Sequence, residues 1–155
     1  MNFTDRYVSP PLELPDPEEP FRRADLEFYD VDHSGPSFAA RIFLNRPEAT
    51  RRTRLDDSTG FAGVFHIFGH GECFGDVGHC DVPEGPLNAY DRRPPHQLVP
   101  YRKVVTVTDA LKRELERGAD EFVVTVVAYV RDRYDGRRPK HDVLRFERVA
   151  LVTYA

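Results

Sequence analysis

The fold is decided by the stretch Phe122-Val123-Val124-Thr125-Val126-Val127-Ala128-Tyr129-Val130. Its β-branched and aromatic residues favour an extended backbone that packs on neighbouring strands. Successive side chains of a strand point to opposite faces of a sheet, and here both sets are almost entirely apolar. The stretch therefore predicts a central strand that is covered on both faces.

Further strands are predicted on both sides of this stretch by the alternation of apolar and polar residues. They are expected over residues 24–31, 38–45, 61–68, 101–108 and 142–154. The strand over 61–68 is apolar on both faces, so it is also expected to be central. In the last strand, the inward-facing residues change phase between Phe146 and Val149, which indicates a β-bulge near Glu147-Arg148.

These patterns predict an all-β fold, an antiparallel, jelly-roll-like β-sandwich. One short helix is expected over 109–117, because Leu111 and Leu115 form an apolar stripe and Gly118 suits the helix end. Residues 69–100 form a long irregular loop. Prolines crowd the segment before residue 24 and favour extended conformations without a core. We therefore expect a proline-rich arm over 1–23 and a single β-sandwich domain over 24–155.

Composition limits the partners of the protein. The chain has 155 residues, of which 40% are hydrophobic and 31% charged, as in a soluble domain with a real core. Its 22 basic residues are scattered among 26 acidic ones without a basic stripe, which argues against nucleic-acid binding. No apolar run approaches the roughly 18 residues of a membrane span, and the N-terminus does not resemble a secretory signal. A cytoplasmic protein without a membrane partner is expected.

One basic cluster, Arg51-Arg52-Thr53-Arg54, is followed at once by Asp56-Asp57. Because the opposite charges are so close in sequence, we expect a solvated face here rather than an anion-binding site.

Potential metal ligands are concentrated between Gly63 and Asp81, a stretch that holds three of the six histidines and both cysteines. Its glycines allow the backbone to fold tightly enough to bring such side chains together. Imidazole and thiolate groups bind Cu(I) and Zn(II) in preference to magnesium or calcium. The stretch thus predicts a copper site, or alternatively a zinc site, formed by His66, His70, Cys73, His79 and Cys80.

Three interpretations of this loop remain open. The spacing matches neither a zinc finger nor a Cys-x-x-Cys knuckle. The loop is either a metal site, a structural loop closed by hydrogen bonds or a Cys73–Cys80 disulfide, or the site of a catalytic thiol paired with a histidine. Catalysis has the weaker support, since no serine lies in a nucleophile elbow and no glycine loop is built for phosphate.

Three segments share a pattern with one known family. They are Arg41-Ile42-Phe43-Leu44-Asn45-Arg46-Pro47, Phe61-Ala62-Gly63-Val64-Phe65-His66-Ile67-Phe68-Gly69-His70-Gly71, and Asp142 to Tyr154. They resemble the β-sandwich domain that follows the di-copper domain in tyrosinases, polyphenol oxidases and molluscan haemocyanins. The resemblance covers roughly residues 24–154. It implies a domain that covers an oxidase active site and, from members whose cysteines are implicated in copper delivery, such a role for Cys73 and Cys80.

In that family, the copper pair lies in a separate helical bundle with two histidine triplets, which this sequence does not contain. Oxidase activity therefore does not follow from the resemblance. The leading expectation is a non-catalytic accessory module that binds copper through the His/Cys loop and docks on a partner oxidase or another protein. The alternative is a small metalloenzyme that uses the same loop for redox or hydrolytic chemistry. A third possibility is a structural interaction domain with a disulfide-closed loop.

Overall fold

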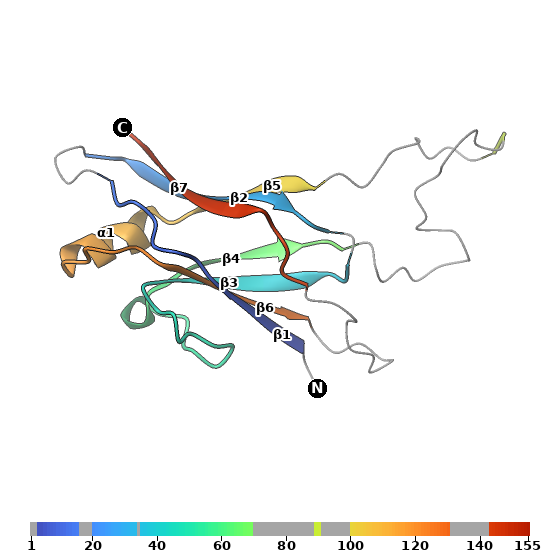
Figure 1. Cartoon of the computed structure of the whole chain (residues 1–155), viewed down its shortest axis with the longest axis horizontal. Coiled ribbons are helices and arrows are strands. Elements are labelled where there is room, and N and C mark those ends of the chain that lie inside the picture. The colour runs from blue at the N-terminus through green and yellow to red at the C-terminus, as the bar shows by residue number, and fades with distance from the viewer. Residues whose placement is uncertain (1–2, 16–19, 34, 70–88, 91–99, 131–142) are drawn as a thin grey trace.

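The computed structural model describes residues 3–15, 20–33, 35–69, 89–90, 100–130 and 143–155. Two antiparallel sheets lie over each other, and one short helix packs against strands of both (Figure 1). The predicted all-β sandwich is therefore confirmed. None of the helices in the described part of the chain is long and apolar enough to cross a membrane.

The larger sheet has four strands in the order β1-β6-β3-β4. Their bounds are β1 Phe3–Val8, β6 Val124–Val130, β3 Phe38–Leu44 and β4 Phe61–Ile67. Strand β6 lies between β1 and β3, and its side chains are buried on both faces except for the half-buried Tyr129. The predicted central strand is confirmed, because only a strand covered on both sides can bury such an apolar run.

The smaller sheet has three strands in the order β5-β2-β7. Their bounds are β5 Tyr101–Thr106, β2 Arg23–Val31 and β7 Arg148–Tyr154. Helix α1, Thr108–Glu116, follows β5 and buries Ala110 and Leu111 in the core. A short 3-10 turn, η1, Asp57–Thr59, precedes β4.

Strand β4 corrects one expectation. It lies at the edge of the larger sheet and pairs only with β3 among the described strands, so the prediction of a central strand over 61–68 is wrong. Phe65 and Ile67 face the core, whereas Val64 and His66 on the other face are exposed. Apolar residues are common on protein surfaces, so the composition of a strand does not by itself show that both faces are covered.

The segment expected to form a surface arm begins with strand β1, which the sequence pattern did not indicate. Asp5 and Tyr7 point inward: the Asp5 carboxylate accepts a hydrogen bond from the Leu144 N–H at 3.0 Å, and the Tyr7 ring packs edge-on against Phe146. Just after the strand, the buried Ser9 hydroxyl accepts a hydrogen bond from the Val124 N–H at 2.9 Å. A polar residue at an inward position hides the alternation that marks a strand.

The last strand begins later than predicted, at Arg148. The regular pairing with β2 runs without a shift from Tyr29↔Arg148 to Arg23↔Tyr154. Before Arg148, the Glu147 N–H donates a hydrogen bond to the Tyr29 carbonyl oxygen and the Asp32 N–H donates one to that of Arg145, both at 2.9 Å. Just before β7, the Phe146 ring packs against the ring of Phe28 in β2, with 5.2 Å between the ring centres. The change of phase in the sequence therefore marks the place where the irregular pairing of residues 145–147 with β2 gives way to the regular ladder.

Phe28 lies at the centre of the main core, with the Phe65 ring 5.1 Å away. A second, small core lies on the outer face of the four-stranded sheet, where Ala49 packs on Phe43, Val127 and Phe61. This second core fixes the segment after β3 over the outer face of the sheet.

Candidate functional site

Of the five predicted metal ligands, the structure describes only His66. His70, Cys73, His79 and Cys80 lie outside the described residues. His66 is exposed near the end of β4, on the outer face of the four-stranded sheet and directly opposite Ala39 of β3. The structure records no hydrogen bond or ion pair for its imidazole among the described residues, which leaves both ring nitrogens accessible to a ligand.

The chain leaves β4 at a fixed position. The Gly69 N–H donates a hydrogen bond to the Ser37 hydroxyl at 3.0 Å. A Cβ atom at Gly69 would lie 2.1 Å from the carbonyl oxygen of Gly35 and 2.4 Å from the carbonyl carbon of Pro36, so only glycine fits. His66 is thus held on a paired strand, immediately before the predicted His/Cys loop.

A metal site is not assembled within the described part of the chain. No group of three or more histidine, cysteine, aspartate or glutamate side chains converges there in an arrangement that could hold a metal ion. The copper or zinc site therefore stays a prediction, with His66 as its one ligand of described position.

The outer face of the three-stranded sheet carries two buried carboxylates, but both are paired. Asp25 lies 2.8 Å from the Arg23 guanidinium, and Glu27 lies 2.7 Å from that of Arg102. The Tyr29 hydroxyl also donates a hydrogen bond to Glu27. The hydrogen bond from Arg23 holds the pKa of the Asp25 carboxyl below its ordinary value, against the opposing effect of burial. Both carboxylates are thus engaged in ion pairs with arginines of the same sheet.

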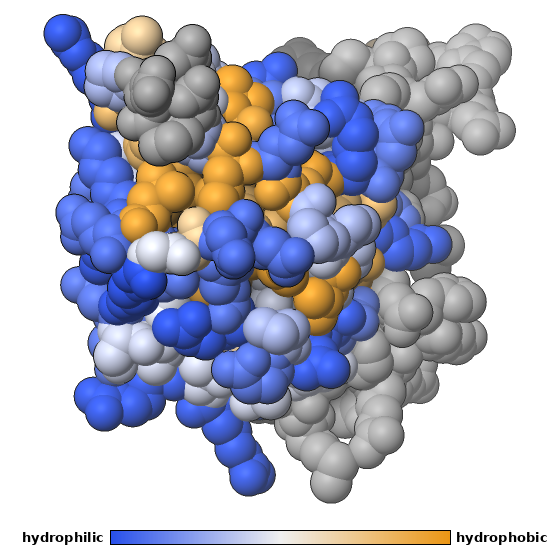
Figure 2. Space-filling view, turned by 60° about the vertical axis from the view of Figure 1, so that its left-hand side comes forward, coloured by the Kyte–Doolittle hydropathy of each residue, from blue (hydrophilic) through white to orange (hydrophobic). Residues whose placement is uncertain are grey.

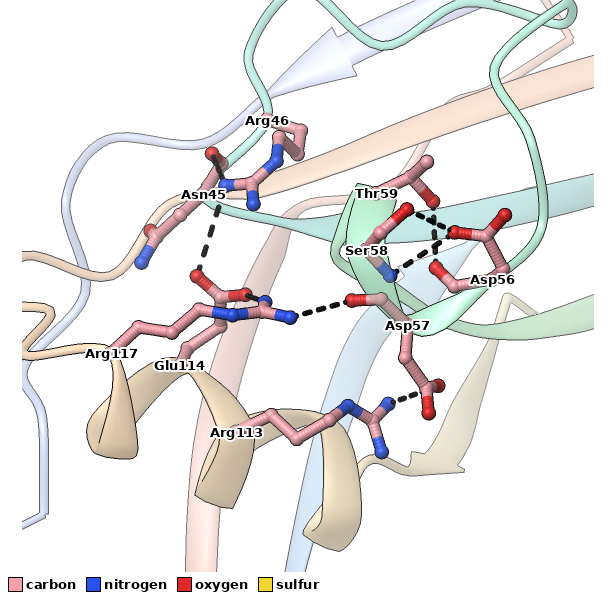
Figure 3. Close-up of polar contacts among 9 residues, drawn as sticks. All are labelled: Asn45, Arg46, Asp56, Asp57, Ser58, Thr59, Arg113, Glu114 and Arg117. Atoms are coloured by element: carbon pink, nitrogen blue, oxygen red, sulfur yellow. Dashed lines mark hydrogen bonds and ion pairs between the residues drawn. The ribbon is translucent and has the colours of Figure 1, made fainter.

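A second polar cluster joins α1 to the segment between β3 and β4 (Figure 3). At its centre the buried Glu114 carboxylate pairs with Arg117 and lies 3.8 Å from the Arg46 guanidinium. Arg113 pairs with Asp57 at 3.0 Å. These ion pairs also match each buried charge with an opposite one, so the cluster is structural.

Apolar side chains gather near the centre of the face shown in Figure 2, with hydrophilic residues around them. Apolar surface of this kind is ordinary in folded proteins, and nothing in the structure shows what would cover it. It therefore identifies no partner.

Side chains from all four strands of the larger sheet form one row on its outer face. Thr4, Tyr129, Ala39 and His66 are direct neighbours across β1, β6, β3 and β4. The row leads from His66 to Tyr129, where Arg41 of β3 and Arg51 of the loop after it lie against the ring. The sequence pattern did not indicate this arrangement, because the three residues come from two strands and a loop.

Comparison with known proteins adds no further identification: no protein-family model matches the chain, and neither a curated protein nor a solved structure shows significant similarity to it. The resemblance to the tyrosinase and haemocyanin β-sandwich therefore stays a prediction.

Proposed function

We propose that this chain is a non-catalytic accessory module that binds copper through the loop after β4 and docks on a partner protein such as a copper oxidase. The observation that carries the proposal is the position of His66. Its imidazole is exposed at the end of an edge strand, where the backbone is fixed by the Gly69–Ser37 hydrogen bond. A ligand held on a paired strand loses little conformational entropy when it binds a metal.

The remaining ligands of the proposed site are His70, Cys73, His79 and Cys80. Two thiolates with imidazoles form a soft ligand set, which suits Cu(I) first and Zn(II) second. Thiolates and imidazoles must lose protons before they coordinate, so the affinity is expected to fall as the pH drops.

A binding role is favoured over catalysis by the described carboxylates. Asp25, Glu27 and Glu114, which are all buried, each pair with an arginine. Each of these carboxylates is engaged in charge-assisted hydrogen bonds with a guanidinium and is not free to contact a substrate. The small metalloenzyme remains the alternative, and it requires an open coordination position in the same loop.

The test is metal analysis of the full chain purified without an affinity tag, followed by Cu(I) titration against a competing chelator. We expect about one copper or zinc ion per chain, and a Cu(I) affinity that falls on the order of 10-fold or more in Cys73→Ser/Cys80→Ser. His66→Ala should weaken binding by a smaller factor. His33→Ala, in the turn after β2, is the matched control and should bind as the wild type does.

Wild-type metal content in the double cysteine variant between about pH 6 and pH 8 would contradict the thiolate site. A thiol titration of the denatured protein without reductant distinguishes a metal site from a loop closed by a disulfide. Two reactive thiols per chain are expected for a metal site, because its cysteines are reduced. No reactive thiol would indicate the Cys73–Cys80 disulfide instead.

A further inference from the structure

Two arginines lie against Tyr129 on the outer face of the four-stranded sheet. The Arg41 guanidinium is 4.9 Å from the centre of the Tyr129 ring, and that of Arg51 is 5.2 Å from it. Arg41 also donates a hydrogen bond to the Arg51 carbonyl oxygen at 2.6 Å. A cation within about 6 Å of a ring centre is attracted to it. The ring thus holds two positive charges close together despite their repulsion.

The segment that carries Arg51 is fixed to the sheet. Ala49 is buried on Phe43 and Val127, in the small outer core. The Thr50 N–H donates a hydrogen bond to the Thr53 hydroxyl at 2.9 Å, and the Arg52 N–H donates one to the Thr50 hydroxyl at 3.2 Å. We call Arg41, Arg51 and Arg52 the arginine cluster.

The acidic residues that follow in sequence do not neutralise this cluster. Asp56 pairs with Arg54 at 2.9 Å, and Asp57 pairs with Arg113 of α1 at 3.0 Å. Within the described residues, no carboxylate lies within ion-pair distance of Arg41, Arg51 or Arg52. The expectation that Asp56-Asp57 balances the basic run therefore holds only for Arg54, which pairs with Asp56, because Asp57 pairs with Arg113 of α1 instead.

A hollow of about 660 Å³ opens beside the cluster and is lined, among the described residues, by Thr4, Thr50, Arg51 and Arg52. Its volume lies within the range of sites for small molecules, roughly 300–1,000 Å³. The Thr50 oxygen already accepts a hydrogen bond from Arg52, so its hydroxyl proton is available to a ligand. The hollow therefore offers guanidinium and hydroxyl donors.

We propose that this hollow binds a phosphoryl group of a small anionic ligand. Guanidinium forks bind phosphate oxygens in pairs, and threonine hydroxyls donate to the oxygens that remain. A phosphoryl group carries close to two negative charges at neutral pH. These two negative charges match the positive charge of the arginine cluster better than the single negative charge of a carboxylate does. None of the described residues that line the hollow is a proposed copper ligand.

The test is isothermal titration of the full chain with inorganic pyrophosphate at fixed ionic strength. We expect saturable binding, weakened about 10-fold or more in Arg51→Gln/Arg52→Gln, since each lost charged hydrogen bond weakens binding by such a factor. Arg54→Gln is the matched control: it lies in the same loop, is exposed, and pairs with Asp56. It should bind within about twofold of the wild type, because it does not line the hollow.

Equal weakening in Arg54→Gln and in the double variant, or a response that never saturates, would overturn the proposal, since either indicates general attraction to surface charge. A metal contribution from the loop after β4 would be the same in both variants and does not affect the comparison. Arg52→Gln alone provides a second variant that should fold normally, because this side chain is exposed. It should weaken binding severalfold, and wild-type affinity would count against the site.

The phosphoryl group can belong to a soluble compound or to a lipid headgroup. Sedimentation with vesicles that contain phosphatidic acid distinguishes these sources. Pyrophosphate binding without sedimentation supports a soluble ligand. Sedimentation that is lost in Arg51→Gln/Arg52→Gln and kept in Arg54→Gln supports a headgroup at the same site.

Discussion

The guanidinium of Arg46 lies 3.8 Å from the buried carboxylate of Glu114, and this contact joins the turn after β3 to the last turn of α1 (Figure 3). Arg117 pairs with the same carboxylate and also donates a hydrogen bond to the Asp57 carbonyl oxygen at 2.8 Å. Glu114 thus connects the helix with two separate points of the segment that covers the outer face of the larger sheet. The same segment carries Arg51 and Arg52.

Glu114→Gln should destabilise the fold by about 1–3 kcal/mol, because a buried charge cluster that loses one member leaves the others incompletely paired. The partly exposed arginines limit the loss, since water can solvate them. Urea denaturation measures the change in the free energy of unfolding. Glu116→Gln is the control, with an exposed side chain on the same helix, and should lie within about 0.5 kcal/mol of the wild type. Equal midpoints for both variants would show that the cluster contributes nothing.

The strands with regular patterns could be predicted from the sequence. Strands β2, β3 and β6 follow the expected positions closely, because their inward residues are apolar and in phase. Strand β1 could not be predicted, since an aspartate faces inward and is satisfied by the Leu144 backbone, far away in sequence. Local sequence patterns cannot indicate such a partner, because only the tertiary structure brings the two residues together.

The two candidate sites differ in the same way. The predicted metal ligands are close together in sequence, so their concentration in one stretch was enough to predict a site. The arginine cluster depends on the register of β3 against β6, which places Arg41 near Tyr129, and on the choice of Arg113 as the partner of Asp57. Charge counting along the chain could not show this, because it does not tell which arginine each aspartate pairs with: Asp56 pairs with its neighbour Arg54, whereas Asp57 pairs with Arg113 of α1.

Thr125→Val should stabilise the protein by about 0.5–1 kcal/mol. Thr125 is fully buried near the start of β6, and its hydroxyl has no hydrogen-bond partner among the described residues. Valine has the same shape and removes the cost of burying an unpaired polar group. Thermal and urea unfolding measure the effect. Thr59→Val is the contrasting variant: the Thr59 hydroxyl bonds to the carbonyl oxygens of Arg54 and Asp56, so its loss should be destabilising. Destabilisation by Thr125→Val would indicate a partner for the hydroxyl.

Ser9→Ala should destabilise the fold by about 1–3 kcal/mol, because it leaves the buried Val124 N–H without its acceptor. The same substitution at the exposed Ser58 should cost about 0.5 kcal/mol or less. Urea denaturation compares the two, and faster hydrogen exchange at the Val124 amide should accompany the loss in Ser9→Ala. Unchanged stability and exchange would show that the chain after β1 is not held against β6.

The carboxylate of Asp25 makes the stability of the fold depend on pH. Asp25 is buried in the middle strand of the smaller sheet, and its carboxylate accepts hydrogen bonds from the Arg23 guanidinium and the Thr106 hydroxyl. These interactions favour the charged form, so the pKa of the folded state lies below that of the unfolded chain, about 3.9. A carboxylate with a lowered pKa contributes stability above the unfolded pKa, and this contribution is lost as the pH falls through the folded pKa.

Asp25→Asn should therefore be destabilising by about 1 kcal/mol at pH 7, a modest value because Arg23 is largely exposed and its charge is screened. The difference from the wild type should shrink as the pH is lowered from about 5 to about 2, because the wild-type carboxyl is then protonated as well. Urea denaturation at both ends of this range measures it, with Asp120→Asn as an exposed control. A difference between wild type and Asp25→Asn that stays constant over the range would show that Asp25 acts through packing and not through its charge.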